Sequence, residues 1–342
     1  MRFAHPDWLD TPGIAAVMSA LPGARLVGGC VRDAMAGHVA KDIDLATPFP
    51  PEDVIGRLEA AGLKAVPTGL AHGTITAVAL GQVVEVTTLR RDVTTDGRHA
   101  TIAFTDDWRE DAARRDFTIN ALYADPVTGE VYDYFGGQDD LAAGIVRFIG
   151  EPLQRIAEDH LRILRFFRFS ARFAKGGFHA ESLAACAARA NDLMALSRER
   201  IAMELLALLT LPDPAPTISL MIEQGIFRPV LPEISDAAPL APLVARESAQ
   251  GVSPDPVRRL AALLPAEVKR VEEVGARLKL SNAQRKRLVT AAKRDEVEDA
   301  ANPEALAYRI GIESAADRLL LGKGDATRLV GWVQPVLPIG GG

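Results

Sequence analysis

Residues 26–45 read LVGGCVRDAMAGHVAKDIDL. The stretch opens with an apolar segment that stops at the glycine pair 28–29, and it closes with alternating acidic and apolar residues over 42–45. Such alternation is typical of a half-buried strand, in which residues i and i+2 lie on one face. We therefore expect Asp42 and Asp44 side by side on a strand, with the apolar residues beside them turned toward the core.

Neighbouring carboxylates repel each other, which costs stability unless a cation lies between them. Carboxylate oxygens at this spacing suit Mg²⁺, which keeps several waters and takes substrate phosphates as further ligands. Glu85 interrupts the β-branched run of residues 83–88 and supplies a third carboxylate of the kind that two-metal phosphoryl-transfer sites use. Each feature by itself also fits a solvated strand face or an exposed edge strand, so both interpretations stay open at this point.

The glycine pair lies between a predicted strand and a predicted helix start. Because Gly28 and Gly29 have no side chains, their backbone N–H groups can approach phosphate oxygens closely. Arg32 adds a guanidinium fork that suits a triphosphate. A glycine pair at the end of a strand is, on its own, more often only a turn.

Composition describes a globular chain of two or three domains. The chain has 342 residues and a net charge of −6, with 48% hydrophobic and 25% charged residues. No apolar run approaches the roughly 20 residues that a membrane span needs. The N-terminus has no apolar signal core, and the two cysteines, Cys30 and Cys186, are far apart. These features predict a cytoplasmic protein with no membrane partner, disulfide framework or zinc site.

The pattern of the chain changes near residue 150. Alternation and turn signals before that point predict strands, and the spacing of apolar residues after it predicts helices, so we expect an α+β fold. The expected strands are 24–27, 42–46, 74–80, 82–89, 101–104, 117–123 and 131–135. The expected helices are 153–173, 180–195 and 198–209, with Ala-rich helical patterns continuing to 332.

Charge is distributed unevenly. Residues 1–146 carry 12 Lys and Arg against 21 Asp and Glu, a net −9, whereas residues 279–294 carry six basic side chains and no acidic one. This basic run predicts either a solvated helix face or an RNA surface. Its members are Lys279, Arg285, Lys286, Arg287, Lys293 and Arg294.

Four more motifs follow in order: RRDFTINAL (114–122), DYFGGQDDL (133–141), EDHLRILRFFRF (158–169) and SRERIAMEL (197–205). With residues 26–45 and Glu85, this series resembles the class II CCA-adding and poly(A) polymerase family of the polymerase-β-like nucleotidyltransferase superfamily. The resemblance implies an N-terminal head with a mixed β-sheet flanked by helices, followed by an all-α neck, body and tail. We place the head at 1–147, the neck at 148–235 and the body and tail at 236–342.

The resemblance also implies roles for individual residues. Asp42 and Asp44 would hold two Mg²⁺ ions, with Glu85 as the third carboxylate, and Arg98 would be the loop residue that helps the switch from C to A addition. The positions that match nucleotide contacts are Gly28, Gly29, Arg32, Arg115, Asp159, Arg162, Arg165 and Arg168.

The expected helix over 158–169 offers a physical route to base selection. Asp159 and Arg162 are three residues apart, so they would be neighbours on one helix face. A carboxylate accepts and a guanidinium donates a hydrogen bond, which matches the amino group and ring nitrogen of C and A and rejects U and G. Without the family context, an ordinary surface ion pair explains the spacing better. Arg168 fits either a nucleotide or RNA contact or a pair with an acidic neighbour.

Within the family, the sequence favours CCA addition to tRNA with CTP and ATP. The stretch 89–104 resembles the flexible loop of CCA-adding enzymes, and the Gly-Arg-Arg-Phe element typical of bacterial poly(A) polymerases is missing. Partial CC or A addition and poly(A) synthesis stay open as alternatives. A protein that binds nucleotide or RNA without catalysis is the alternative from a different class. The sequence does not distinguish a monomer from a homodimer.

Overall fold

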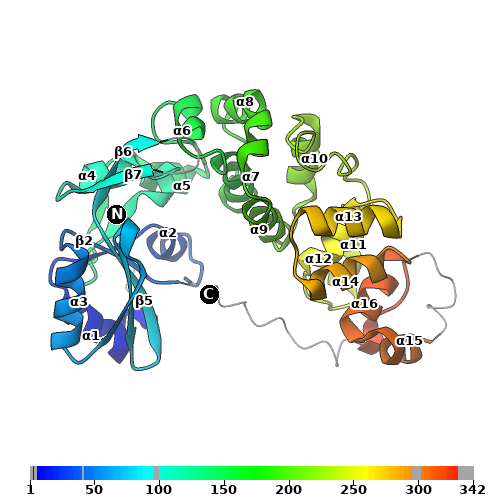
Figure 1. Cartoon of the computed structure of the whole chain (residues 1–342), viewed down its shortest axis with the longest axis horizontal. Coiled ribbons are helices and arrows are strands. Elements are labelled where there is room, and N and C mark those ends of the chain that lie inside the picture. Colours follow the sequence, from blue (N-terminus) through cyan, green and yellow to red (C-terminus); the bar gives the residue numbers. More distant parts are fainter. Residues whose placement is uncertain (1–2, 4–5, 41, 96–99, 295–301, 330–342) are drawn as a thin grey trace. The chain divides into compact units, whose positions relative to one another are not determined.

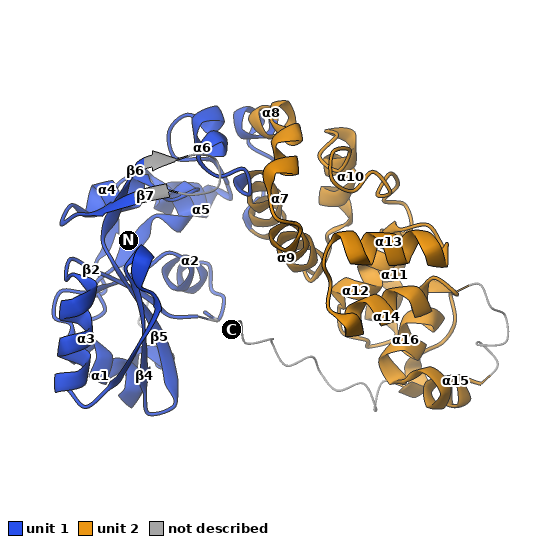
Figure 2. Ribbon diagram, viewed as in Figure 1, with its two compact units in different colours: residues 1–162, 173–183 blue, residues 163–172, 184–342 orange. Residues whose placement is uncertain are grey.

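The computed structural model describes residues 3, 6–40, 42–95, 100–294 and 302–329, and the chain divides into two compact units (Figure 2). Unit 1 comprises residues 1–162 and 173–183, and unit 2 comprises residues 163–172 and 184–342. Within the described residues, all strands belong to unit 1, and unit 2 is built from helices. No described helix is both long enough and apolar enough to cross a bilayer.

A seven-stranded sheet forms the centre of unit 1 (Figure 1). Its strand order is β3-β4-β5-β2-β1-β8-β9, and every pair is antiparallel except β2 and β5, which run parallel. The mixed sheet and the helices around it confirm the predicted α+β class. The strands are β1 (Arg25–Val27), β2 (Asp44–Thr47), β3 (Lys64–Gly69), β4 (Thr74–Ala79), β5 (Gln82–Thr88), β8 (Leu122–Ala124) and β9 (Val131–Asp133).

One face of the β4–β5 hairpin is buried and the other is open. Val84 and Val86 are fully buried, whereas Val83 and Glu85, which alternate with them, are exposed, as a two-faced strand requires. Helices α1 (Pro12–Ala20) and α3 (Pro51–Ala60) contact both strands of this hairpin. The acidic side of β5 therefore faces away from the apolar packing.

The remaining elements of unit 1 surround the middle of the sheet. A separate antiparallel ribbon pairs β6 (Arg90–Thr95) with β7 (Ala100–Phe104). The helices are α2 (Gly29–Met35), α4 (Trp108–Ala113), α5 (Gly137–Ala143) and α6 (Pro152–Glu158). A buried cluster joins β1, β2 and β8 to α4, and its members are Val27, Ala46, Leu89, Ala112, Ala121, Tyr123 and Ile149.

Unit 2 packs short helices around apolar clusters. One buried cluster joins α11, α12, α15 and α16, and it includes Leu243, Ala262, Leu306, Leu319 and Leu320. The helices of unit 2 are α7 (Arg162–Phe173, of which 163–172 belong to this unit), α8 (Ala180–Ala188, from residue 184), α9 (Arg198–Leu209), α10 (Ala215–Glu223), α11 (Leu240–Ala249), α12 (Pro256–Leu263), α13 (Val268–Arg277), α14 (Asn282–Ala291), α15 (Pro303–Ile310) and α16 (Ile312–Leu321).

Most predicted elements are confirmed, including the hairpin that turns at Gly81, but two are wrong in part. Residues 117–123 form a 3₁₀ turn, Thr118–Asn120, before the short strand β8. The Asp116 side chain explains the turn, because its Oδ1 accepts hydrogen bonds from the backbone N–H of Phe117 at 2.8 Å and from Asn120 Nδ2 at 2.9 Å. The predicted helix over 153–173 is interrupted between α6 and α7.

Candidate active site

Two carboxylates, Asp44 and Glu85, lie opposite each other on paired strands of unit 1, and a third, Asp42, lies just before the first of these strands. β2 and β5 pair so that Asp44 lies directly opposite Glu85, and Asp42 comes two residues before Asp44. Asp44 is partly buried, whereas Asp42 and Glu85 are exposed. The structure thus brings together Asp44 and Glu85, whereas Asp42, which was predicted on the same strand as Asp44, lies two residues before β2 begins. Asp44 and Glu85 are 41 residues apart in the chain (85 − 44), so the topology of the sheet determines their meeting.

The pKa of Asp44 reflects this concentration of negative charge. Burial and the carboxylates of Glu85 and Asp42 raise the pKa of Asp44 to about 6, while the guanidinium groups of Arg115 and Arg32 lower it. The two arginines therefore offset only part of the combined effect of burial and of the neighbouring carboxylates. A site of this composition favours an additional cation.

Asp44→Asn is expected to stabilise the metal-free protein above about pH 6. The carboxyl of Asp44 loses its proton near pH 3.9 in an unfolded chain and near pH 6 in the folded one, so the folded state loses stability as pH rises through this window. Removing the charge returns at most about 3 kcal/mol, at about 1.4 kcal/mol for each unit by which the pKa is raised. Thermal unfolding with EDTA measures the gain, which should be present near pH 8 and absent near pH 4. An equal gain at both pH values would indicate a change in packing instead.

Gly28 ends β1 in a conformation that other residues rarely adopt. Its φ is 68° and its ψ is −115°, and its N–H donates to the carbonyl of Leu122 at 2.9 Å. A Cβ at this position would come within 3.1 Å of Nη1 of Arg115. The glycine therefore provides both the turn and the room that the Arg115 guanidinium occupies.

Arg32 is held by protein groups. It is buried, its Nε and Nη2 donate to Asp33 Oδ1 at 2.8 and 2.6 Å, and its Nη1 donates to Asn120 Oδ1. The guanidinium carbon also lies 4.6 Å from the centre of the Phe173 ring. These contacts fix the position of the positive charge that acts on Asp44.

The prediction that Asp159 and Arg162 are neighbours on one helix face is wrong, because the chain leaves the helix between α6 and α7. Asp159 is extended, with φ −150° and ψ 108°, and its Oδ1 accepts from the backbone N–H of Leu161 at 3.1 Å. This local hydrogen bond competes with helix formation, so the two residues do not share one helix face. Arg162 is buried and pairs with Glu158 at 2.6 Å, and its Nη2 donates to the carbonyl of Arg114 at 2.9 Å.

Arg165 and Arg168 lie further along α7 and belong to unit 2. Both pair with the buried Glu204 of α9: Arg168 Nε lies 2.6 Å from its Oε2, and Arg165 Nη1 lies 3.6 Å from its Oε1. Both guanidinium groups also lie against the Phe169 ring. The guanidinium carbon of Arg168 is 4.4 Å from the ring centre, and that of Arg165 is 5.1 Å from it. The sequence left open whether Arg168 contacts a nucleotide or RNA, or pairs with an acidic neighbour. The structure contains the acidic pair, which Arg168 forms with Glu204.

Comparisons with known proteins agree with this geometry. Residues 24–147 match the family model described as the poly A polymerase head domain, and residues 177–238 match the probable RNA and SrmB-binding site of polymerase A. CCA tRNA nucleotidyltransferase 1, mitochondrial, of Danio rerio is 41% identical over 265 residues, which cover 76% of this chain and 61% of the relative. The CCA-adding enzyme of Oceanobacillus iheyensis is 39% identical over 181 residues, covering 52% of this chain and 44% of the relative.

The fold agrees as well. The crystal structure of Bacillus stearothermophilus CCA-adding enzyme in complex with CTP matches with a TM-score of 0.72 at 28% identity, covering 95% of this chain and 80% of that one. Residues 24–147 thus match the poly A polymerase head domain, and the chain is similar in sequence and fold to CCA-adding enzymes. It spans about three fifths of the length of the mitochondrial relatives that it matches.

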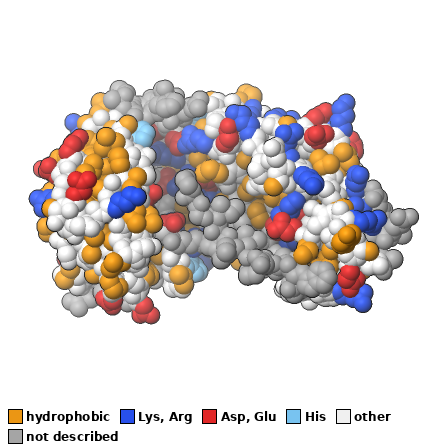
Figure 3. All heavy atoms as spheres, turned by 60° about the horizontal axis from the view of Figure 1, so that its bottom comes forward, with side chains coloured by type: hydrophobic (Ala, Val, Ile, Leu, Met, Phe, Trp, Pro, Cys, Tyr) orange, Lys and Arg blue, Asp and Glu red, His pale blue; other side chains and the backbone are white. Residues whose placement is uncertain are grey.

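Two further predictions concern Arg98 and the basic run of residues 279–294. Arg98 lies in residues 96–99, outside the described part of the chain; β6 and β7 of the ribbon lead into and out of that segment. The basic run of residues 279–294 occupies the connection after α13, helix α14 and the residues that follow it. Figure 3 shows one face of the molecule, on which basic side chains are scattered among acidic ones.

Several members of the basic run are bound to other protein groups. Arg287 pairs with the fully buried Asp317 at 2.8 Å and with Asp255 at 3.0 Å. Lys279 pairs with Glu199 at 2.7 Å on the surface. Arg285 is partly buried, whereas Lys286 and Lys293 are exposed. Only part of the run is therefore presented to solvent.

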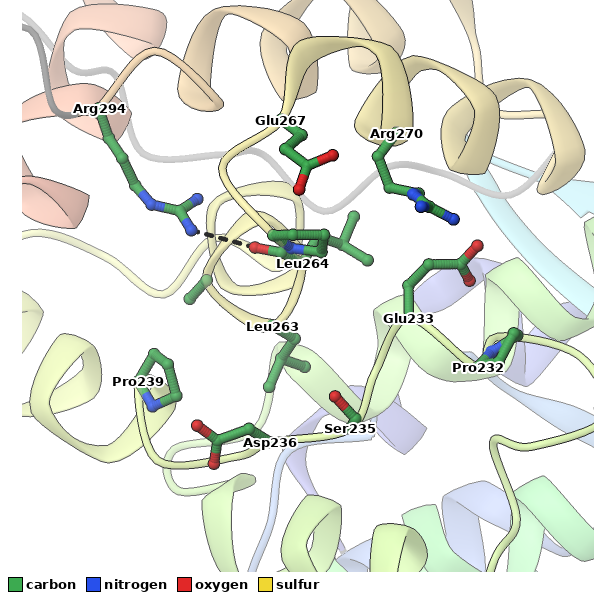
Figure 4. Close-up of a pocket in the computed structure, with 12 residues that line it drawn as sticks. Pro232, Glu233, Ser235, Asp236, Pro239, Leu263, Leu264, Glu267, Arg270 and Arg294 are labelled. Atoms are coloured by element: carbon green, nitrogen blue, oxygen red, sulfur yellow. Dashed lines mark hydrogen bonds between the residues drawn. The ribbon is translucent and has the colours of Figure 1, made fainter.

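Arg294 lines a pocket of about 520 Å³ between the segment after α10 and the α12–α13 connection (Figure 4). Its guanidinium donates to the carbonyls of Ala261 at 2.9 Å and Leu264 at 3.0 Å. Glu267 and Arg270 also line this pocket. The contacts of Arg294 fasten the end of α12, which is a structural use of its charge.

Sequence reasoning missed the residues that hold Arg115 and Arg162 in place. Asp111 and Tyr123 contact Arg115, and Glu158 pairs with Arg162. A signal for Asp111 was available, because Arg114 and Arg115 follow it at the i+3 and i+4 spacing of a helical ion pair. Nothing in the sequence alone indicated Tyr123, whose contact depends on the pairing of β8 with β1.

Proposed function

We propose that this chain adds C, C and A to the 3′ end of tRNA, using CTP and ATP and releasing pyrophosphate, without a nucleic-acid template. The observation that supports the proposal most directly is the juxtaposition of Asp44 and Glu85 on paired strands, with Asp42 two residues away and Arg115 close enough to influence their charge. Relatives that carry the names CCA tRNA nucleotidyltransferase and CCA-adding enzyme favour this reaction among those of the family.

The donor set fits Mg²⁺. Asp42 and Asp44 offer hard oxygen ligands. Burial is the main cause of the raised pKa of Asp44, and the carboxylates of Glu85 and Asp42 add repulsion that a divalent cation would reduce. In the described residues, no three His, Cys, Asp or Glu side chains form a group that could hold a metal by themselves. Substrate phosphates and waters would supply the remaining ligands, as is usual for Mg²⁺ at phosphoryl-transfer sites. When bound, Mg²⁺ would promote ionisation of the RNA 3′-hydroxyl and neutralise charge on the leaving pyrophosphate.

The protein's own groups would position the two substrates. Arg115 would contact the triphosphate beside the carboxylates, and Gly28 leaves room for its guanidinium. Arg32 would contribute positive charge from its fixed position on Asp33 and Asn120. Positioning and charge neutralisation supply most of the rate in phosphoryl transfer, so little else is required of the protein.

Base selection would fall to the link between α6 and α7. The carboxylate of Asp159 would accept from the amino group of C or A, and a free guanidinium hydrogen of Arg162 would donate to the adjacent ring nitrogen. The support is that Arg162 is held rigidly by Glu158 and by backbone carbonyls. A rigid donor discriminates between bases better than a mobile one.

Asp159→Ala is expected to retain Mg²⁺-dependent transfer but to lose most of its rejection of UTP. The loss should be about tenfold to a hundredfold in the ratio of kcat/KM for CTP to that for UTP, corresponding to about 1–3 kcal/mol for one base contact. Single-nucleotide incorporation on one tRNA measures the ratio. Glu151→Ala, which removes an exposed carboxylate just before α6, is the matched control. If the Asp159 variant still rejected UTP as strongly as the parent, this residue would not read the base.

One assay tests the proposal against its alternatives. Three RNAs are compared, namely tRNA lacking its CCA, tRNA ending in CC and an unrelated RNA, each with CTP, ATP, UTP or GTP. Complete CCA on the first RNA supports the proposal. Addition that stops after CC, or occurs only on the second RNA, indicates a partial enzyme, and long A tails on any RNA indicate a poly(A) polymerase. No incorporation by folded protein indicates a nucleotide- or RNA-binding protein.

We also propose a division of labour along the chain. Residues 1–147 would catalyse transfer, residues 148–235 would select the nucleotide and residues 236–342 would bind tRNA. Lys286 and Lys293, two exposed members of the basic run, support an RNA contact in the last segment. We propose the cytoplasm as the compartment, which the two buried, unpaired thiols of Cys30 and Cys186 support.

A further inference from the structure

Helix α4 carries a buried carboxylate that receives hydrogen bonds from four groups. Asp111 is only 1% exposed. Its Oδ1 accepts from the backbone N–H of Arg90 at 3.1 Å and from Arg114 Nε at 2.9 Å. Its Oδ2 accepts from the Tyr123 hydroxyl at 2.6 Å and from Arg115 Nη2 at 3.3 Å. The four donors come from the start of β6, the end of α4 and β8.

These contacts keep Asp111 ionised. Burial raises the pKa of a carboxyl, but Arg115, Arg114 and the Tyr123 hydroxyl hold the pKa of Asp111 at about 2. The side chain is therefore a fixed negative charge at any pH at which the protein would work. A negative charge that is held in place and shielded from water can orient a neighbouring guanidinium.

Arg115 extends from this carboxylate toward the active site. Its Nε donates to the Tyr123 hydroxyl at 3.3 Å, so two groups hold one edge of the guanidinium. Its Nη1 lies over Gly28, where a Cβ would come within 3.1 Å. The guanidinium is thus held on one side by Asp111 and Tyr123, and on the other side it lies against Gly28 at the glycine pair.

We propose that Asp111 is a positioning residue, which orients Arg115 for the phosphates of the incoming nucleotide and ties that orientation to the base of the β6–β7 ribbon through the N–H of Arg90. Asp111 itself does not touch the substrate. The inference rests on the proposed function, because it assumes a nucleoside triphosphate in this site. It adds a residue whose effect on the nucleotide passes entirely through another side chain.

A double-mutant cycle tests the proposal by calorimetric measurement of CTP binding to the full chain. Asp111→Asn is expected to weaken CTP binding by about tenfold or more, since one charge-assisted contact is lost. Arg115→Ala should weaken it at least as much, and the double variant should be no weaker than Arg115→Ala alone. A merely structural role for Asp111 predicts that the two losses multiply, and that outcome would overturn the proposal.

Further variants keep the test decisive. Glu110→Gln changes the preceding carboxylate of α4, which pairs with Arg91 at 3.9 Å on the surface, and should leave CTP affinity unchanged. If Asp111→Asn does not fold, Tyr123→Phe removes the hydroxyl that bonds both side chains. Its effect should likewise disappear in the Arg115→Ala background, and persistence there would count against the proposal.

The cycle also separates this inference from the proposed function. If the parent protein binds CTP but incorporates nothing into any RNA, the proposed reaction fails while the cycle still decides the role of Asp111. If the parent protein does not bind CTP at all, the inference fails together with the site on which it rests.

Discussion

Asp44→Asn is expected to lower Mg²⁺-dependent incorporation of CMP into tRNA by about a thousandfold or more, because it removes a ligand and a charge from the centre of the site. Asp44 is the most buried of the three carboxylates; it begins β2 and lies opposite Glu85 of β5, and Asp42 precedes it by two residues. No neighbouring group can replace it without a change in the pairing of β2 with β5. Single-turnover kinetics at saturating tRNA and Mg²⁺ measure the loss.

The same variant provides an internal check on folding. Asp44→Asn should be more stable than the parent without metal above about pH 6, because the pKa of Asp44 is raised in the folded state. A gain in stability combined with a loss of activity cannot result from misfolding. Asp53→Asn, in the exposed first turn of α3, is the matched control and should retain full activity. Activity within about tenfold of the parent in the Asp44 variant would refute the assignment of this site.

The sequence predicts the sheet well because strand signals are local. The alternation of residues 82–89 recurs in the structure as β5, and that of residues 42–45 recurs in part, because β2 begins at Asp44. The parallel pairing that puts Asp44 opposite Glu85 is not a local property. Only the family resemblance, which relates the order of motifs to a known topology, made that meeting predictable.

Predictions failed where a polar side chain bonds to nearby backbone. The apolar spacing of residues 153–173 is helical throughout, yet the Asp159 side chain accepts from Leu161 N–H and the helix stops there. In the same way, Asp116 replaces an expected strand with a turn at 118–120. Periodicity records which residues are apolar, and it does not record which short polar side chains will bind the chain itself. Both exceptions lie within motifs that match the family.

The basic run shows a different limit of sequence reasoning. Six positive charges without an acidic residue between positions 279 and 294 are consistent with an RNA surface or with internal ion pairs. Arg287 pairs with carboxylates that are distant in the sequence. Asp255 lies 32 residues before it, and Asp317 lies 30 residues after it. Glu313 is a third partner on the C-terminal side. No pattern within the run reveals them. Members of the run must therefore be tested one by one.

Arg287→Met is expected to lower the free energy of unfolding of unit 2 by about 3 kcal/mol or more, because it leaves a buried carboxylate without its main partner. Asp317 is fully buried and accepts from Arg287 at 2.8 to 3.0 Å, while its other cationic partner, Arg258, is 3.4 Å away. Burial raises the pKa of Asp317 to about 6 even with both arginines present. Without Arg287 the carboxyl would take up a proton near neutral pH, so the loss of stability should be greatest in alkaline solution.

Lys286→Met is the matched control, since it removes an exposed positive charge from the neighbouring position of α14. Its effect on urea unfolding should be within about 0.5 kcal/mol, whereas it should reduce the salt dependence of tRNA binding if this face contacts RNA. Arg287→Met, measured where it is still folded, should leave that salt dependence unchanged because its charge is already neutralised by three carboxylates. The opposite result, with normal stability and a reduced salt dependence in Arg287→Met, would assign Arg287 to RNA binding and not to the interior of unit 2.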